Sequence, residues 1–290
     1  MMKQKILEQG MRVVFFLAAL TSIIAVLLIC IFLFANGIPA MREIGLFDFL
    51  LGKNWSPTDV PPSFGILPMI LGSIYVTATA IIIGVPIGIL AAVFLAKVCP
   101  RQAYRFLKPA VELLAGIPSV VYGFFGIVVI VPVIRNLFSA AHTNGNTILT
   151  AGVLLGIMIL PTIIGISEAA IRAVPDSYYE GSLALGATHE RSVFFTVLPA
   201  AKSGILAAVI LGIGRAIGET MAVVMVAGNQ PRMPAGLLKG VRTMTSNIVI
   251  EMGYAAELHR DALIATGVVL FVFILLINLC FSILKRRENR

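Results

Sequence analysis

Two charged residues, Arg215 and Glu219, interrupt a segment from Ile210 to Val226 that is otherwise without charge. A charge at bilayer depth costs several kcal/mol, with values of about 2.5 to over 10 for an unpaired arginine. In a continuous helix, residues four apart share one face, so the two side chains are expected within pairing reach. This pair offers an anion a fixed cation, and the adjacent Thr220 adds a hydroxyl. The alternative is an ion pair that only fixes helix register.

Composition places these residues in a membrane protein. The chain is 59% hydrophobic and 12% charged, whereas a soluble domain carries about 25% charged residues. Apolar segments of the roughly 20 residues needed to cross a bilayer recur along the chain. We therefore expect an all-α integral membrane protein with six transmembrane helices. The expected spans are residues 13–35, 68–96, 112–134, 148–171, 203–228 and 262–284.

The loops predict the orientation. Lys and Arg number 14 on the side of the two termini and 7 on the opposite side. This bias predicts that both termini lie in the cytoplasm, and it accounts for the net charge of +8 without a nucleic-acid partner. The first apolar run is too long for a signal peptide, so we expect a retained span. Residues 1–66 would hold that span and an outer loop, and residues 67–290 a five-helix domain.

The expected cytoplasmic loop 172–202 carries signals of two short helices. Ser177 and Glu180 have the spacing of a capping box. Gly186 is expected to end the first helix, Thr188 to cap the second, and Pro199 to close the unit. The result is either an elbow that meets a partner protein or one that packs on itself. The apolar residues expected to be available to a partner are Leu183, Ala184, Leu185 and Ala187.

Other titratable residues offer weaker signals. Glu168, near the cytoplasmic end of the fourth span, is expected to snorkel or to serve the loop that follows. Glu112 is expected at the membrane interface near Lys108. The three histidines are scattered and have no metal-ligand spacing, so no metal site is expected.

The stretch from Glu180 to Pro199 resembles the EAA loop of ABC-importer permeases, written EAA-x3-G-x9-I-x-LP. Four of its positions match at the family's spacing, namely Glu180, Gly186, Leu198 and Pro199, while Gly181, Ser182 and Thr196 depart from it. The resemblance implies a type I ABC importer permease (MetI-like) fold. It also implies that the elbow is the coupling helix that docks on a cytoplasmic ATPase subunit.

A second resemblance concerns the substrate. The run from Gly214 to Val223, Gly-Arg-Ala-Ile-Gly-Glu-Thr-Met-Ala-Val, resembles the PstC-type permeases of phosphate importers. So do the stretches Gly116–Gly123 and Phe49–Pro57. This resemblance implies a subunit that forms half of a phosphate pathway in the prokaryotic plasma (inner) membrane, with Arg215, Glu219 and Thr220 along that path. A guanidinium suits phosphate because it makes parallel charge-assisted hydrogen bonds.

The implied partners are a PstA-like permease subunit, a PstB-like ATPase dimer and an extracytoplasmic phosphate-binding protein. The chain has no G-x4-G-K-[ST] loop, so ATP is expected on the partner and no cofactor on this chain. No enzyme motif is present either, and a transport subunit is expected. The alternatives are the PstA position, another oxyanion such as sulfate, molybdate or tungstate, and a secondary anion transporter or channel that works alone.

Overall fold

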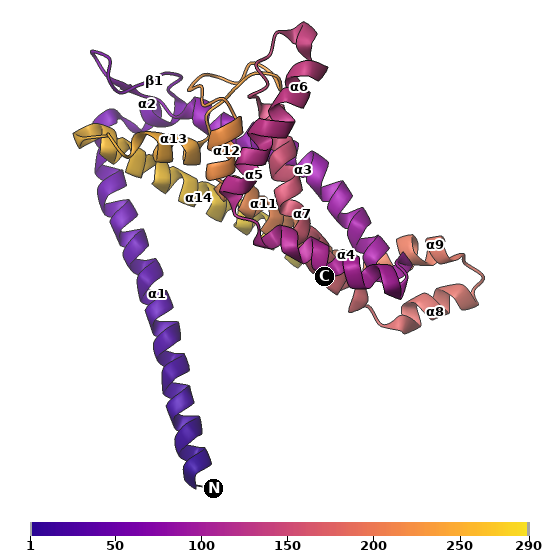
Figure 1. Ribbon diagram of the computed structural model, residues 1–290. Helices are drawn as coiled ribbons and strands as arrows, with labels where there is room; N and C mark the ends of the chain where they lie inside the picture. The colour runs from indigo at the N-terminus through magenta and orange to yellow at the C-terminus, as the bar shows by residue number, and fades with distance from the viewer. Residues whose placement is uncertain (1, 289–290) are drawn as a thin grey trace.

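The computed structural model describes the backbone of residues 2–288 and the side chains of residues 10–280 and Ile283. It is built mainly of helices (Figure 1). In chain order they are α1 (Met2–Ile44), α2 (Leu46–Leu51), α3 (Leu67–Val93), α4 (Arg101–Gly116), α5 (Ser119–Phe125), α6 (Val131–Leu137), α7 (Ile148–Arg172), α8 (Asp176–Ala184), α9 (His189–Ser192), α10 (Leu198–Ala200), α11 (Lys202–Gly218), α12 (Met221–Val226), α13 (Met244–Glu251) and α14 (Glu257–Glu288). Terminal basic side chains used for the orientation, Lys3, Lys5 and those from Lys285 on, lie outside the described residues.

The molecule has two distinct ends (Figure 1). At one end β1 (Trp55–Ser56) and β2 (Ser63–Phe64) form a short antiparallel hairpin, which lies near α2 and α13. We call this the hairpin end. At the other end α8 and α9 project beyond the long helices, and we call it the elbow end.

The long helices agree with the expected membrane spans. Five described helical segments are long and apolar enough to cross a bilayer. A sixth is reached if the pair His189–Ala200 and Lys202–Gly218, which is bent by 71°, counts as one broken span. The predicted all-α fold is therefore confirmed, with five spans, or six if the bent pair is one span. Several predicted span boundaries differ from the structure, since the first apolar helix, for example, extends to Ile44 and not to residue 35.

The third span begins at Ser119 and not at residue 112. A proline disfavours helical backbone in the residue before it, and Ile117, which precedes Pro118, is extended with a ψ of 127°. Residues 112–116 instead complete α4, a strongly amphipathic helix with no buried residue. The absence of charge from Leu113 onward hid this boundary in the sequence.

The predicted fifth span, 203–228, is broken near its middle. α11 ends at Gly218, Glu219 is extended with a ψ of 128°, and α12 starts at Met221. The carbonyl of Glu219 accepts a hydrogen bond from Thr245 Oγ1 at 3.2 Å, so α13 helps to hold the interruption. A break at the presumed ion pair changes the geometry of the candidate site.

The centre of the bundle is a close contact between α3 and α7. A Cβ on Gly152 would lie 2.4 Å from Thr79 Cγ2, and one on Gly84 would lie 2.8 Å from the carbonyl oxygen of Gly156. Only glycine allows this approach, which small residues favour between helices in membranes. α1 stands apart from this bundle in Figure 1 and meets it mainly along α14, where the rings of Phe34 and Phe271 are 6.0 Å apart.

Candidate functional site

Arg215 lies in the last turn of α11, and its side chain is exposed. Its Nη1 donates a hydrogen bond to Thr162 Oγ1 of α7 at 3.3 Å. Among the described residues, no carboxylate lies within ion-pair distance of this guanidinium. Most of its hydrogen-bonding capacity therefore remains open to a ligand or to a partner.

The expected pairing of Arg215 with Glu219 does not occur. Because the chain leaves the helix at Gly218, the two residues no longer share a helical face. The carboxylate of Glu219 instead accepts a hydrogen bond from the backbone N–H of Ala222 at 3.3 Å and so caps α12. Thr220 Oγ1 donates to the carbonyl of Gly218 at 3.1 Å. Sequence spacing predicted a pair, and the structure places the three residues around a helix break.

The backbone around Arg215 is open. A Cβ placed on Gly214 or on Gly218 would meet nothing within 4 Å. The guanidinium thus stands beside space that this chain does not fill. In an apolar span, such a cation can meet a solvated anion or a polar group of a second subunit.

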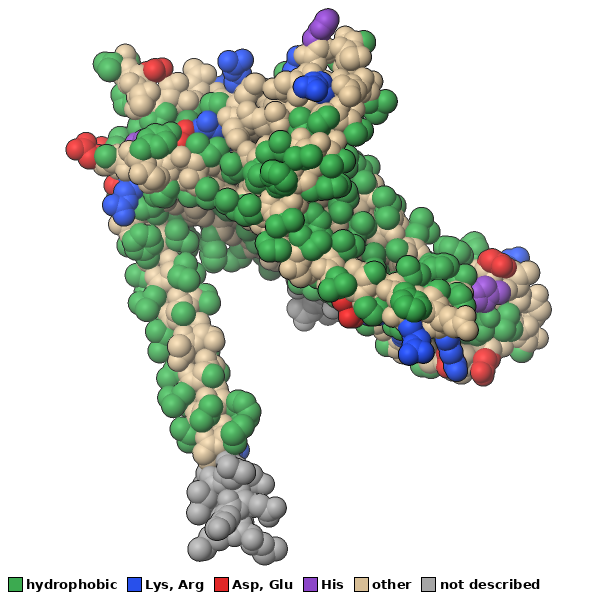
Figure 2. Space-filling view, viewed as in Figure 1, with side chains coloured by type: hydrophobic (Ala, Val, Ile, Leu, Met, Phe, Trp, Pro, Cys, Tyr) green, Lys and Arg blue, Asp and Glu red, His purple; other side chains and the backbone are tan. Residues whose placement is uncertain are grey.

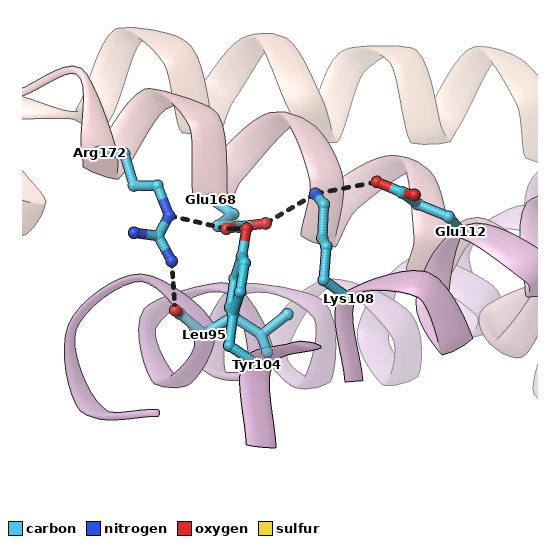
Figure 3. Close-up of polar contacts among 6 residues, drawn as sticks. All are labelled: Leu95, Tyr104, Lys108, Glu112, Glu168 and Arg172. Carbon is cyan, nitrogen blue, oxygen red and sulfur yellow. Dashed lines mark hydrogen bonds and ion pairs between the residues drawn. The ribbon is translucent and has the colours of Figure 1, made fainter. Parts of the chain in front are cut away.

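A second polar cluster lies at the end of α7, toward the elbow, and we call it the Glu168 cluster. Glu168 is 2% exposed and accepts hydrogen bonds from Tyr104 Oη and Lys108 Nζ, both at 2.7 Å, and from Arg172 Nε at 2.8 Å. Arg172 also donates to the carbonyl of Leu95 at 2.8 Å (Figure 3). The cluster connects α4, and the π-helical segment Phe94–Val98 that follows α3, to α7.

The expectation that Glu168 snorkels is wrong, because its carboxylate is buried and fully partnered within the protein. Glu112 does lie near Lys108, with Oε1 3.7 Å from Nζ. The i,i+4 spacing of Glu168 and Arg172 was visible in the sequence, whereas the partners on α4 lie 60 or more positions away and gave no signal.

The charge states of the α4 residues in this cluster are stable. Burial lowers the pKa of Lys108, but the hydrogen bond and charge of Glu168 outweigh it and raise that pKa above its usual value. The hydrogen bond to Glu168, together with burial, raises the pKa of Tyr104. Both groups therefore keep their protons throughout the neutral range, and any loss begins only in strongly alkaline solution.

The elbow is pinned at its base and free at its tip. Val193 and Val197 are buried against the ends of α3 and α7, and Tyr179 Oη lies 2.7 Å from His189 Nδ1. At the tip Gly186 adopts a φ of +87°, the left-handed turn expected of it, and Leu185 is 91% exposed. An apolar side chain so exposed next to a glycine turn presents a contact surface.

The helix caps predicted for the elbow are confirmed only in part. α8 begins at Asp176 with Pro175 before it, so the capping box predicted from Ser177 and Glu180 is wrong. Thr188 caps α9 as predicted, since its side chain accepts from the N–H of Arg191. The remaining residues of the EAA-like pattern are placed as follows: Glu180 is exposed on α8, Leu198 is half-buried in α10, and Pro199 is exposed at the bend before α11.

A third polar cluster holds the hairpin end together, and we call it the Glu251 cluster. Glu251 of α13 is buried; its Oε2 accepts from Trp55 Nε1 at 2.8 Å and lies 2.8 Å from His259 Nε2, while its Oε1 meets Arg242 Nη1. Arg242 Nε also donates to the carbonyl of Asn229 at 3.1 Å. No sequence pattern predicted this cluster, because Trp55 and Glu251 are 196 positions apart.

Comparisons with known proteins agree with this architecture. The relatives include a probable ABC transporter permease protein, YqgH, of Bacillus subtilis, 40% identical over 92% of this chain and 88% of the relative. They also include a phosphate transport system permease protein, PstC, of Mesorhizobium japonicum, 37% identical over 86% of this chain and 81% of the relative.

Among solved structures, a chain of a bacterial alginate ABC transporter in complex with an alginate-bound periplasmic protein superposes with a TM-score of 0.66. It is 17% identical and covers 95% of this chain and 96% of its own. This likeness confirms the ABC importer permease fold. The family model described as "Binding-protein-dependent transport system inner membrane component" matches residues 84–290. The chain therefore belongs to the family of binding-protein-dependent transport system inner membrane components.

Proposed function

We propose that this chain is the permease subunit of an ATP-driven phosphate importer and forms half of its transmembrane pathway. The observation that carries the proposal is Arg215, an exposed guanidinium beside open space in a helix that has no other charged residue after Lys202. The relative named as a phosphate transport permease, 37% identical, supports phosphate as the substrate.

The chemistry around the helix break suits a transient phosphate site. Arg215 supplies a permanent positive charge and N–H donors that match phosphate oxygens. Glu219 caps α12 through Oε1, and no described residue hydrogen-bonds its Oε2. That oxygen is available to accept a hydrogen bond from the O–H group of a protonated phosphate, which sulfate at neutral pH does not offer. A single arginine also favours release, since conduction requires exit as well as entry.

The elbow connects this site to the energy source. We place Glu180 to Gly186 against an ATPase dimer in the cytoplasm, where the exposed Leu185 would enter a cleft of that partner. Its motion passes through Leu198 and Pro199 to α11, which ends near Arg215. Alternating access then exposes the guanidinium first to one side of the membrane and then to the other.

The proposed assembly also contains a PstA-like permease subunit and an extracytoplasmic phosphate-binding protein. In this arrangement both termini and the elbow end lie in the cytoplasm, and the hairpin end faces outward. The binding protein captures phosphate, because the loops at the hairpin end are too short to form a separate capturing domain.

The test is phosphate uptake by the complete complex in proteoliposomes, wild type against Arg215→Gln, Arg215→Lys and the exposed control Arg42→Gln. Losing a charge-assisted contact should lower uptake by Arg215→Gln about 10- to 100-fold. Arg215→Lys should fall between it and the wild type, and Arg42→Gln should match the wild type. Each complex is checked for assembly by size-exclusion chromatography.

Normal uptake by Arg215→Gln, or failure of that variant to assemble, would contradict a substrate role for Arg215. Two further arms address the alternatives. Strong inhibition of uptake by excess sulfate, molybdate or tungstate would overturn phosphate as the substrate. Uptake by this chain without the ATPase subunit would overturn the ABC mechanism in favour of an autonomous transporter.

A further inference from the structure

The hairpin end contains a hollow of about 480 Å³, within the range of small-molecule sites. It lies between the loop that joins α6 to α7 and the loop that joins α12 to α13. The polar and charged side chains lining it are His142, Thr143, Asn144, Gln230, Arg232 and Lys239. We call it the basic pocket.

The charged side chains that line the basic pocket, Arg232 and Lys239, are both positive. Arg232 and Lys239 are exposed, and neither residues 138–147 nor residues 227–243 contain an Asp or Glu. The third cation of these loops, Arg242, is neutralised by Glu251 outside the pocket. On the face shown in Figure 2, blue and purple side chains gather around α6 with no red among them. Because basic residues are disfavoured in outer loops, the presence of Arg232 and Lys239 here indicates a function for their charge.

The walls of the basic pocket are held in place by hydrogen bonds. The N–H of Ile148 donates to the carbonyl of Lys239 at 3.1 Å, and that of Leu149 to Leu237 at 2.9 Å. Thr143 Oγ1 donates to the carbonyl of Leu238 at 3.1 Å. The first N–H groups of α7 are therefore occupied, so the start of this helix offers no free donor to an anion in the pocket.

The basic pocket is connected to the candidate site through α12. The α12–α13 loop follows α12 directly, and at its other end α12 begins next to Glu219 and Thr220. Its six residues span about 9 Å at 1.5 Å per residue. α12 thus connects the break beside Arg215 to the beginning of the loop that carries Arg232 and Lys239.

We propose that the basic pocket is an external binding site for inorganic phosphate, which collects the anion before it reaches Arg215. This inference rests on the proposed function. A concave site of this volume, lined by solvated cations, fits a small anion, and docking of an acidic protein surface is the other possibility. The second possibility is treated as an outcome of the test.

The experiment compares three double variants of the complete complex in proteoliposomes. Arg232→Gln/Lys239→Gln removes the pocket charges, Arg232→Lys/Lys239→Arg keeps them, and Arg42→Gln/Arg260→Gln removes two external charges elsewhere. Initial phosphate uptake is measured with saturating phosphate-loaded binding protein. The charge-removing pocket variant should be slower by about tenfold, the low end of what focused charge contributes to capture, and the other two should match the wild type.

Two direct measurements complete the test. Inorganic phosphate should slow acylation of Lys239 by an amine reagent, read by mass spectrometry, and chloride at equal ionic strength should not. The affinity of the binding protein for the complex should be the same for the wild type and for Arg232→Gln/Lys239→Gln. Wild-type uptake by that variant, absence of phosphate protection, or loss of binding-protein affinity would each overturn the pocket proposal. Failure of the wild-type complex to take up phosphate would instead overturn the proposed function.

Discussion

The buried carboxylate of Glu168 accepts three hydrogen bonds, from a hydroxyl, an ammonium and a guanidinium. Burial of a lone carboxylate would be unfavourable, and these three donors compensate for it. Arg172 adds a cation–π contact, with its Cζ 4.7 Å from the centre of the Tyr104 ring. The Glu168 cluster therefore connects α4 to α7 through buried, charge-assisted hydrogen bonds.

Replacing Glu168 by Gln keeps the shape of the side chain and removes its charge. Lys108 and Arg172 are partly exposed, so water compensates them in part, and we expect a loss of about 1–3 kcal/mol in stability. Thermal unfolding in detergent should show Tm lower by several degrees. The control Glu112→Gln changes a solvent-exposed ion pair and should stay within about 0.5 kcal/mol of the wild type. Equal Tm values for Glu168→Gln and the wild type would contradict a stabilising role for the Glu168 cluster.

At the scale of helices, the sequence predicted what depends on hydrophobicity and missed what depends on contacts between distant segments. Uncharged runs located the spans, and Gly186 marked the end of α8 correctly. The break at Glu219 has no proline or glycine at its extended position; α13 holds it through Thr245. The candidate site was thus found by residue type, while its geometry required the fold.

The elbow gives a prediction at the same scale. Leu185 is almost fully exposed, so Leu185→Asp should leave the stability of the chain within about 0.5 kcal/mol of the wild type. Because we propose that Leu185 enters an apolar cleft of the ATPase, a charge at this position should nevertheless abolish ATP-driven uptake and weaken copurification of the ATPase. Val60→Asp, at a residue that is 99% exposed at the hairpin end, is the matched control and should transport normally. Normal uptake by Leu185→Asp would exclude this part of the elbow from coupling.

At the scale of the whole molecule, a buried apolar cluster holds the first helix and the hairpin to the rest of the chain. The expected division at residue 66 stays a prediction. Phe49, Trp55 and Phe64 share one buried cluster with Met244 and Leu263, which come from the other end of the sequence. The hairpin end therefore depends on packing between residues 1–66 and the last two helices, and the Glu251 cluster is the polar part of that contact.

Glu251→Gln tests this connection. The substitution leaves Arg242 largely buried without its carboxylate, and we expect a loss of about 3 kcal/mol in stability, the order found when one partner of a buried ion pair is removed. Trp55→Phe keeps an aromatic ring but removes the Nε1 donor, and it should cost less, about 1–2 kcal/mol. Because both changes act on one carboxylate, the stability lost in the double variant should be smaller than the sum of the two single losses.

Chemical unfolding in detergent measures the stability of all three variants, with the exposed Asp59→Asn as control. Strict additivity, or a wild-type stability for Glu251→Gln, would mean that the hairpin end is held by apolar packing alone.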